Sequence, residues 1–174
     1  MEVSRVSPEL KSEQARLVTE IDKAFSGVSR EGGVSWSESV IIDEYGSDAK
    51  RTAARACDKD TSWNELVDDE GWDASTGVGG WSFLDSIGFR YYLPAGMLRE
   101  LSGDALDGFP FQLTLGRVFL RDYTLGQWSL LNERQKKCVG DFIRFQARRY
   151  EEEGHDYSSK QWLKAYRSYW IQYS

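Results

Sequence analysis

The sequence has 174 residues and a net charge of −6, with 40% hydrophobic and 29% charged residues. This length and composition are typical of a single globular domain, and they exclude both a disordered chain and a mostly membrane-embedded one. No apolar stretch approaches the roughly 20 residues that cross a bilayer, and the first residues are polar rather than a signal-peptide core, so we expect a cytoplasmic protein.

The first predicted element is a helix that begins at Pro8. Ser7 is a suitable N-cap, and proline costs least at the first helical position. The apolar residues that follow recur at helical spacing, and Gly27 is a typical helix stop. The stripe consists of Leu10, Leu17, Val18, Ile21 and Phe25, with Gln14 as its polar member.

Two further helices are predicted before residue 60. The apolar run Val40-Ile41-Ile42 is too short for its periodicity to distinguish helix from strand, and we interpret it as helical. Residues 48–58 are rich in alanine and arginine, which favours helix. Ser62 and Glu65 have capping-box spacing and predict a short turn. This turn leads into the longest predicted loop, residues 68–80.

The apolar segment from Trp81 predicts a helix that Ser86 can cap. Pro94 is expected either to kink this helix or to start another one, which runs to Gly103. A short helix is expected after Pro110. Its apolar residues are Leu113, Leu115, Val118, Phe119 and Leu120.

The C-terminal part predicts two amphipathic helices. Asn132 and Gln135 have the spacing of a capping box, and Gly154 ends the helix that they start. Its buried face is predicted to hold Cys138, Val139, Phe142, Ile143 and Gln146, and its polar face Arg134, Lys137, Asp141, Arg144 and Arg148. A last helix is predicted from Ser159 to Tyr173. The whole pattern predicts an all-α fold, a compact multi-helix bundle that forms one domain over residues 1–174, with at most minor irregular or short strand elements.

The sequence contains no pattern that predicts a catalytic residue, a metal site or a cofactor site. His155 is expected in an exposed loop, where no nearby group would orient its ring. Residues 77–80 are glycine-rich but lack the lysine and the strand–helix frame of a phosphate-binding loop. Cys57 and Cys138 lie far apart in the sequence, and we expect both to be buried free thiols.

The charges are distributed unevenly along the chain. Residues 38–76 hold eleven acids and four bases, a net charge of −7, whereas residues 117–174 hold eleven bases and seven acids, a net charge of +4. The local acidity argues against nucleic acid as a partner and allows attraction of a basic protein. Alternatively, Arg144, Arg148 and Lys164 neutralise these acids inside the molecule.

The loop that follows Glu65 is the candidate partner-binding site. We expect it to project from the domain and to present an aromatic anchor among carboxylates that steer a basic partner. The candidate residues are Glu65, Asp68, Asp69, Glu70, Trp72 and Asp73. A solvated acidic loop is the alternative. A calcium loop is less consistent with the sequence, because the alternate-position ligands and the distal glutamate of an EF-hand are absent.

Seven tryptophans are many for a chain of this length. We expect four of them to pack helices together in the core: Trp63, Trp81, Trp162 and Trp170. Trp72 is the exception, because it stands between acids in a predicted loop. The alternative is that exposed tryptophans form a platform for a carbohydrate or a nucleotide.

The segment 88–95, Gly-Phe-Arg-Tyr-Tyr-Leu-Pro-Ala, is the most distinctive motif. A Trp-x-x-Leu turn at 63–66 and the pair Phe83-Leu84 precede it, and the pattern Asn132, Gln135, Val139, Phe142 and Ile143 follows it. With these features the sequence resembles an uncharacterised family of small stand-alone bacterial proteins, over about residues 14–150. The resemblance implies a helical bacterial domain and no known activity.

The motif itself has a physical interpretation. Phe89, Tyr92 and Leu93 are expected to fill the core before Pro94 redirects the chain. Arg90 and Tyr91 are the candidates for ligand binding within the motif, although Arg90 could equally pair with an acid.

These observations favour a non-enzymatic protein-binding protein, such as an immunity protein that neutralises a bacterial toxin through its acidic surface. Two other classes stay open. One is an enzyme of unknown reaction whose dispersed site uses Arg90, Tyr91 and carboxylates of the acidic segment. The other is a carbohydrate- or nucleotide-binding module with tryptophan platforms.

Overall fold

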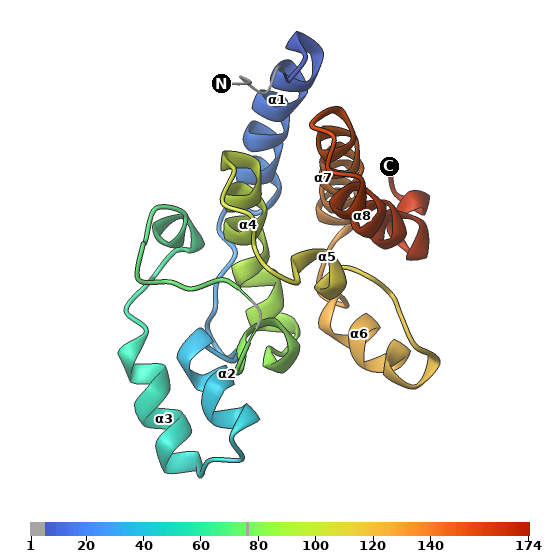
Figure 1. Ribbon diagram of the computed structural model, residues 1–174. Coiled ribbons are helices and arrows are strands. Elements are labelled where there is room, and N and C mark those ends of the chain that lie inside the picture. Colours follow the sequence, from blue (N-terminus) through green and yellow to red (C-terminus); the bar gives the residue numbers. More distant parts are fainter. Residues whose placement is uncertain (1–5, 76) are drawn as a thin grey trace.

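The structure is a computed structural model that describes residues 6–75 and 77–174. Every regular element within these residues is a helix, so the all-α prediction is confirmed (Figure 1). The α-helices are α1 (Pro8–Ala24), α2 (Trp36–Asp43), α3 (Asp48–Cys57), α4 (Ser86–Ser102), α5 (Phe109–Gln112), α6 (Arg121–Gln127), α7 (Glu133–Glu152) and α8 (Asp156–Ser168). The 3₁₀ helices are η1 (Trp63–Leu66), η2 (Gly80–Phe83), η3 (Val118–Leu120) and η4 (Trp170–Gln172). None of the described helices is both long and apolar enough to cross a membrane.

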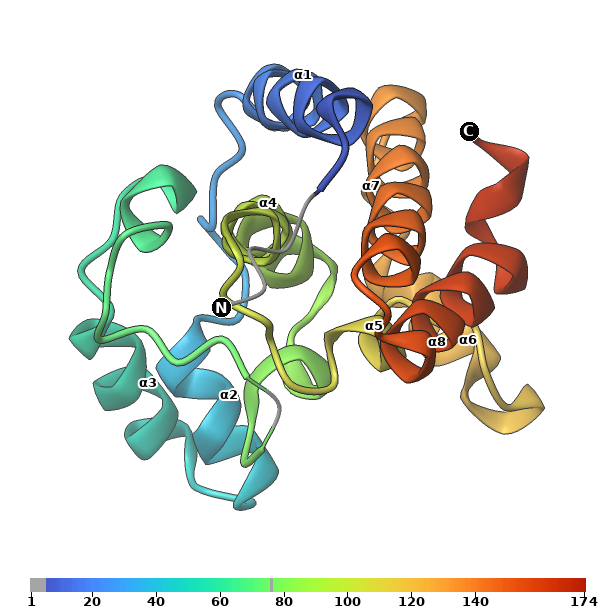
Figure 2. The same cartoon turned by 45° about the horizontal axis from the view of Figure 1, so that its top comes forward.

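Helix α4 is the centre of the fold. Figure 2 shows it almost end-on, with α1 above it, α7 to one side and the α2–α3 pair below. Phe89, Tyr92 and Leu93 are fully buried in it, as predicted. The helix approaches its neighbours closely at Gly96, where an added Cβ would lie 3.0 Å from the rings of Phe109 and Trp81. A helix with apolar residues on most of its faces is typical of a buried position.

The start of α4 corrects one prediction, and its middle excludes the alternative that Pro94 starts a new helix. Asp85, not Ser86, is the N-cap, and its carboxylate accepts a hydrogen bond from the Gly88 N–H at 2.8 Å. Pro94 lies inside one continuous helix that runs to the left-handed cap at Gly103. A proline inside a helix costs about 3 kcal/mol. Burial of the residues on both sides of Pro94 outweighs this cost, since Leu93 and Ala95 are fully buried.

Helices α1, α7 and α8 form a layer on one side of α4. The predicted caps are confirmed, because Ser7 accepts from the Leu10 N–H and Asn132 and Gln135 form a reciprocal capping box. The predicted buried face of α7 is also confirmed. The last helix differs from the prediction: it begins at Asp156 and breaks at Tyr169, and η4 then turns Trp170 into the core.

Helices α2 and α3 pack against each other, and α2 also packs against η2. The helical interpretation of both segments is confirmed, but α2 buries Glu38 rather than its apolar run. The Glu38 carboxylate receives hydrogen bonds from Arg51 at 3.0 Å and from Arg55 at 2.7 Å. Burial opposes the charged form of Glu38, but hydrogen bonds from Arg55, Ser35 and Arg51 keep its pKa below the ordinary value.

The connection between α4 and α7 is less regular than predicted. The helix expected after Pro110 is only α5, which ends at Gln112. The apolar residues Val118, Phe119 and Leu120 form η3 on the surface instead of continuing this helix into the core. Leu113 and Leu115, in contrast, are buried.

Candidate functional site

The predicted acidic loop places its carboxylates in solvent but not its tryptophan. Glu65, Asp68, Asp69, Glu70 and Asp73 are exposed. Trp72 is only 5% exposed, so the expectation that it projects as an anchor is wrong. The loop lies flat against the domain, with acids outside and an indole underneath.

Trp72 turns inward because an aromatic cluster from distant segments receives it. Its ring stacks on that of Tyr92 with the centroids 5.8 Å apart, and it meets the ring of Trp36 edge-on at 5.2 Å. Such offset and edge-to-face ring pairs stabilise the fold beyond the contribution from burying the large apolar surface of the rings. The indole Nε1–H of Trp72 is buried and has no hydrogen-bond acceptor among the described residues.

Arg99 of α4 fixes the backbone of the same loop. Its guanidinium donates hydrogen bonds to the carbonyl oxygens of Leu66 at 3.1 Å, Val67 at 3.3 Å and Trp72 at 2.6 Å, and to that of Asp69. These carbonyls lie at the end of η1 and in the loop after it, where no continuing helix supplies backbone donors in a regular pattern. The acidic loop is therefore held in one position by a buried cation.

A cavity of about 390 Å³ lies between this loop and the α2–α3 pair. Trp36, Trp72 and Tyr92 contribute aromatic surface to it. The charged residues that line it are Asp58, Lys59, Asp60, Glu65 and Asp69. We call this the acid-rimmed cavity. Aromatic surface beneath carboxylates is a suitable environment for a cation.

Hydrogen bonds hold the carboxylates of the rim in place. Asp58 accepts from the backbone N–H of Ser37 at 2.9 Å and from its hydroxyl at 2.6 Å. Asp60 forms an ion pair with Arg30 at 3.2 Å. Hydrogen bonds from Thr61 lower the pKa of Glu65, so this carboxylate is charged at neutral pH.

Tyr91 and Arg90, the two residues of the segment 88–95 that were predicted as possible ligand-binding groups, have different environments. Tyr91 is fully buried, and its hydroxyl donates to Asp60 at 2.7 Å; burial and this carboxylate raise its pKa. Tyr91 therefore orients Asp60 from below and does not line the cavity. Arg90 is half-buried, does not line the acid-rimmed cavity, and its Nε has no partner among the described residues.

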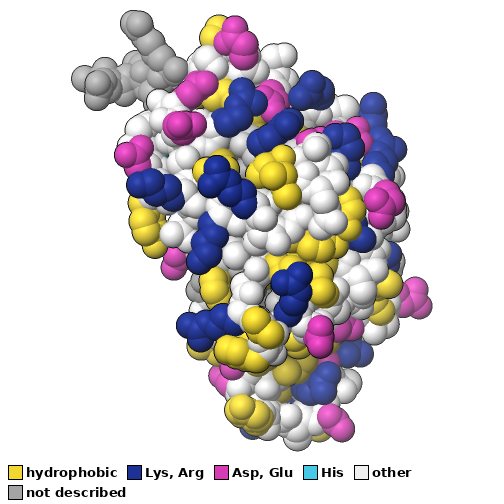
Figure 3. Space-filling view, turned by 90° about the vertical axis from the view of Figure 1, so that its right-hand side faces the viewer, with side chains coloured by type: hydrophobic (Ala, Val, Ile, Leu, Met, Phe, Trp, Pro, Cys, Tyr) yellow, Lys and Arg dark blue, Asp and Glu magenta, His cyan; other side chains and the backbone are white. Residues whose placement is uncertain are grey.

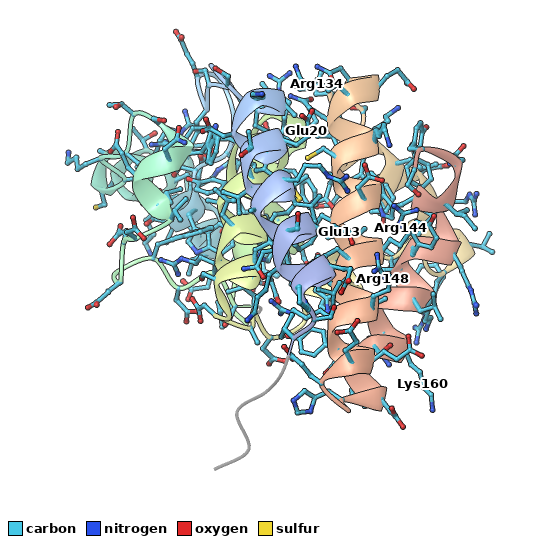
Figure 4. All side chains as sticks on the ribbon, turned by 90° about the horizontal axis from the view of Figure 1, so that it is seen from above. Glu13, Glu20, Arg134, Arg144, Arg148 and Lys160 are labelled. Carbon is cyan, nitrogen blue, oxygen red and sulfur yellow. The ribbon has the colours of Figure 1, made fainter. Side chains whose placement is uncertain are left out.

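The basic C-terminal helices do not neutralise the acidic segment. Arg148 pairs with Glu13 of α1 at 2.7 Å, and Arg144 lies 3.8 Å from Asp141 of its own helix (Figure 4). Lys164 forms no ion pair within residues 6–75 and 77–174. The alternative in which these three residues relieve the acidic segment is thus wrong.

Six carboxylates consequently keep an uncompensated charge on one side of the domain, and we call them the acidic face. None of the six forms an ion pair with a described residue. They are Asp58, Glu65, Asp68, Asp69, Glu70 and Asp73. Two arginines of the acidic segment, Arg51 and Arg55, form ion pairs with the buried Glu38 instead of with these six carboxylates.

Sequence reasoning missed a second hollow, of about 580 Å³, on the other half of the molecule. Phe111, Leu120, Tyr123 and Lys164 line it, and the exposed segment 116–123 runs beside it. Val118-Phe119-Leu120 was predicted only as the apolar part of a short helix after Pro110. The arginines at 117 and 121 that enclose them were the available signal of a surface position.

No group of three His, Cys, Asp or Glu side chains within residues 6–75 and 77–174 could hold a metal ion. His155 is exposed at the start of α8, where it was expected. Four tryptophans predicted for the core, Trp63, Trp81, Trp162 and Trp170, are buried. The cysteines are both free, but only Cys138 is buried; Cys57 is exposed at the end of α3, which corrects its prediction.

The comparisons with known proteins give one match. A model of a family of unknown function (DUF6714) matches residues 13–174. This match includes the aromatic tail after Gly154, which the resemblance seen in the sequence left outside. No curated protein and no solved structure matches the sequence.

Proposed function

The chain belongs to the family of unknown function DUF6714, and from its geometry we propose that it is a non-enzymatic protein that binds a basic partner protein on its acidic face. The observation that carries this proposal is the set of uncompensated carboxylates around an aromatic-lined cavity. The basic side chains that could neutralise these carboxylates from within the molecule pair elsewhere or form no ion pair among the described residues.

Binding would use two physical effects. The exposed carboxylates of residues 65–73 attract a basic surface from a distance and raise the association rate. A lysine or arginine side chain of the partner then enters the acid-rimmed cavity, where its charge meets Asp58 and Asp69 over the aromatic surface.

The finer form of the proposal is an immunity protein that neutralises a basic bacterial toxin. Its support is the charge complementarity that such an inhibitor would use. A toxin gene directly upstream of the gene for this chain would add to that support.

The enzyme and the tryptophan-platform alternatives find less support in the structure. Tyr91 is buried, and its hydroxyl is hydrogen-bonded to Asp60. Six of the seven tryptophans are buried: Trp63, Trp72, Trp81, Trp128, Trp162 and Trp170. A stacking platform for a sugar or a base needs an accessible ring face.

The cavity can be tested with N-acetyl-arginine methylamide and with short arginine-rich peptides as probes. Indole N–H signals in ¹⁵N–¹H spectra identify each tryptophan, and Trp72→Phe assigns the signal of Trp72. We expect the Trp72 signal to shift during the titration. If the signals of Trp72 and Trp36 stay fixed at saturating peptide, the cavity does not receive a cation.

The steering effect is tested by charge reversal. The triple variant D68K/D69K/E70K should bind the same peptides at a much lower association rate and with weaker salt dependence. The control E9K/E31K/E151K changes the net charge equally at exposed acids outside the acidic face. Equal association rates for the two triple variants would contradict the proposal.

A further inference from the structure

We propose that a second surface, on the side of the molecule away from the acidic face, binds an acidic and apolar segment of a partner protein. We call it the apolar–basic face. Its apolar residues are Phe111, Val118, Phe119, Leu120 and Tyr123, and its cations are Arg117, Arg121, Lys160, Lys164 and Arg167. Figure 3 shows this side of the molecule, with exposed hydrophobic side chains between lysines and arginines. The proposal does not depend on the acidic face.

The apolar side chains of this face are unusually exposed. Val118 is 88% exposed, Phe119 74% and Phe111 72%. All residues of the segment 116–123 are exposed, and Val118, Phe119 and Leu120 are consecutive within it. An apolar patch with a polar rim is typical of a protein-binding surface.

The patch surrounds a hollow whose walls are already fixed. The Tyr123 hydroxyl donates to the Ser82 carbonyl oxygen at 2.5 Å, and the Gln127 amide donates to the carbonyl oxygens of Trp81 and Leu84, each at 2.9 Å. The volume of about 580 Å³ lies within the usual range of ligand clefts, about 300–1,000 Å³. A preformed hollow favours the insertion of an apolar side chain, because little order has to be created on binding.

The cations of the apolar–basic face are not neutralised by ion pairs with described residues. None of the five forms an ion pair with a described residue. On the α1–α7 side of the same molecule some cations are paired, as between Arg134 and Glu20 at 2.7 Å (Figure 4). Lys11, Arg16 and Lys23 of α1 form no ion pair with a described residue, so the apolar–basic face differs by its exposed apolar residues and its hollow. Lys160 extends away from these pairs at the end of the molecule in the same view. Asp122 is the acid that the exposed segment itself contains.

Charge and shape together select the occupant. Unpaired cations around an apolar hollow fit a protein segment with a large apolar side chain flanked by aspartate or glutamate. Nucleic acid would use the cations but leave the apolar residues without a contact. A lipid surface would bury the apolar residues but would not fill a rigid hollow. A second copy docking its acidic face here would form a head-to-tail contact, which gives a ring or an open chain of molecules.

The occupant can be identified by selection from a random peptide display library on the immobilised full chain. We expect peptides that combine leucine, phenylalanine or tryptophan with several acids, and we expect the double variant V118S/F119S not to retain them. Both substituted residues are exposed, and circular dichroism checks that the fold is kept. Selection of basic or uncharged peptides on this face would overturn the proposal.

An enriched peptide, labelled with fluorescein, then gives the affinity by fluorescence anisotropy. The triple variant R117E/R121E/K164E should weaken binding about tenfold or more. The matched control K11E/R16E/K23E alters exposed cations of α1 and should leave the affinity unchanged. Equal loss in both triple variants would show that only net charge matters, and would contradict the proposed site.

Two further measurements separate the other occupants. Binding to vesicles of phosphatidylserine and phosphatidylcholine, without binding of any peptide, would replace the proposal by a membrane contact. Concentration-dependent association in light scattering that V118S/F119S abolishes, again without peptide binding, would replace it by a contact between copies. The variant D68K/D69K/E70K should keep its peptide affinity, so failure here is distinguishable from failure of the acidic face.

Discussion

The guanidinium of Arg99 lies over the ring of Trp72, with its Cζ 4.8 Å from the ring centroid. Arg99 belongs to the central helix α4, and Trp72 belongs to the acidic loop, so this contact joins the core to the candidate binding surface. The guanidinium of Arg99 thus holds the loop in two ways. It makes a cation–π contact with the ring of Trp72, and it donates hydrogen bonds to carbonyl oxygens of the loop. The position of the acidic loop therefore depends on one buried side chain.

Replacing Arg99 with methionine should release the loop and destabilise the domain. The substitution keeps apolar volume but removes the side-chain donor of the carbonyls of Val67 and Trp72. We expect a loss of about 3 kcal/mol in the free energy of unfolding, measured in urea. Faster amide hydrogen exchange in residues 66–72 should accompany it. A loss below about 1 kcal/mol would show that the loop is held mainly by the ring of Trp72.

Replacing Phe142 with alanine tests the core between α7 and α8. Phe142 is fully buried, and its ring centroid lies 5.4 Å from that of Trp162. The cavity left behind should lower the free energy of unfolding by about 3–5 kcal/mol. The control Arg144→Ala, on the exposed side of the same helix, should change it by less than about 0.5 kcal/mol. Similar values for the two variants would place the wrong face of α7 in the core.

Glu100 should make the stability of the domain depend on pH near neutrality. Its side chain is only 2% exposed, and desolvation raises its pKa from 4.5 to about 7, against the hydrogen bond from the Leu106 N–H. Because its pKa is higher in the folded state than in the unfolded state, protonated Glu100 contributes stability to the fold. This contribution is complete below pH 4.5 and is lost as the pH rises through about 7. The full change is about 3 kcal/mol.

The measurement is the free energy of unfolding of the wild type and of Glu100→Gln across this pH range. The amide does not titrate, so the difference between the two proteins isolates the carboxyl of Glu100. We expect the wild type to lose stability relative to the variant as the pH rises. Parallel pH profiles would mean that Arg149, whose guanidinium lies 4.0 Å from the carboxylate, keeps Glu100 charged throughout.

The two cysteines should differ strongly in reactivity. Cys57 is exposed at the end of α3, whereas Cys138 is 1% exposed and burial raises its pKa to about 12. A thiol reagent reacts with the accessible thiolate. The native protein should therefore take up one equivalent of Ellman's reagent quickly and the second only after unfolding in urea. Rapid reaction of both thiols would show that α7 opens in the native state, and reaction of neither would indicate that the two form a disulfide.

Local sequence determined where most helices of this protein begin. A capping box needs only a short polar side chain and a partner three residues later, as in Ser62 with Glu65 and Asn132 with Gln135. The same holds for the buried face of α7, because a stripe at helical spacing fixes which side chains share a face. The all-α class and the acidic carboxylates in solvent followed from such local patterns.

Tertiary structure alone decided which of the remaining aromatic and apolar residues are buried. Trp72 looked like a projecting residue among acids, but Trp36 and Tyr92 from other segments receive its ring. Val118 and Phe119 were predicted as apolar residues of a helix after Pro110, but they lie in η3 and no element covers them. Burial depends on which distant segments pack against a residue, and this information is not contained in the residues next to it. For the same reason the sequence could show the imbalance of charge but not the two faces on which it stays uncompensated.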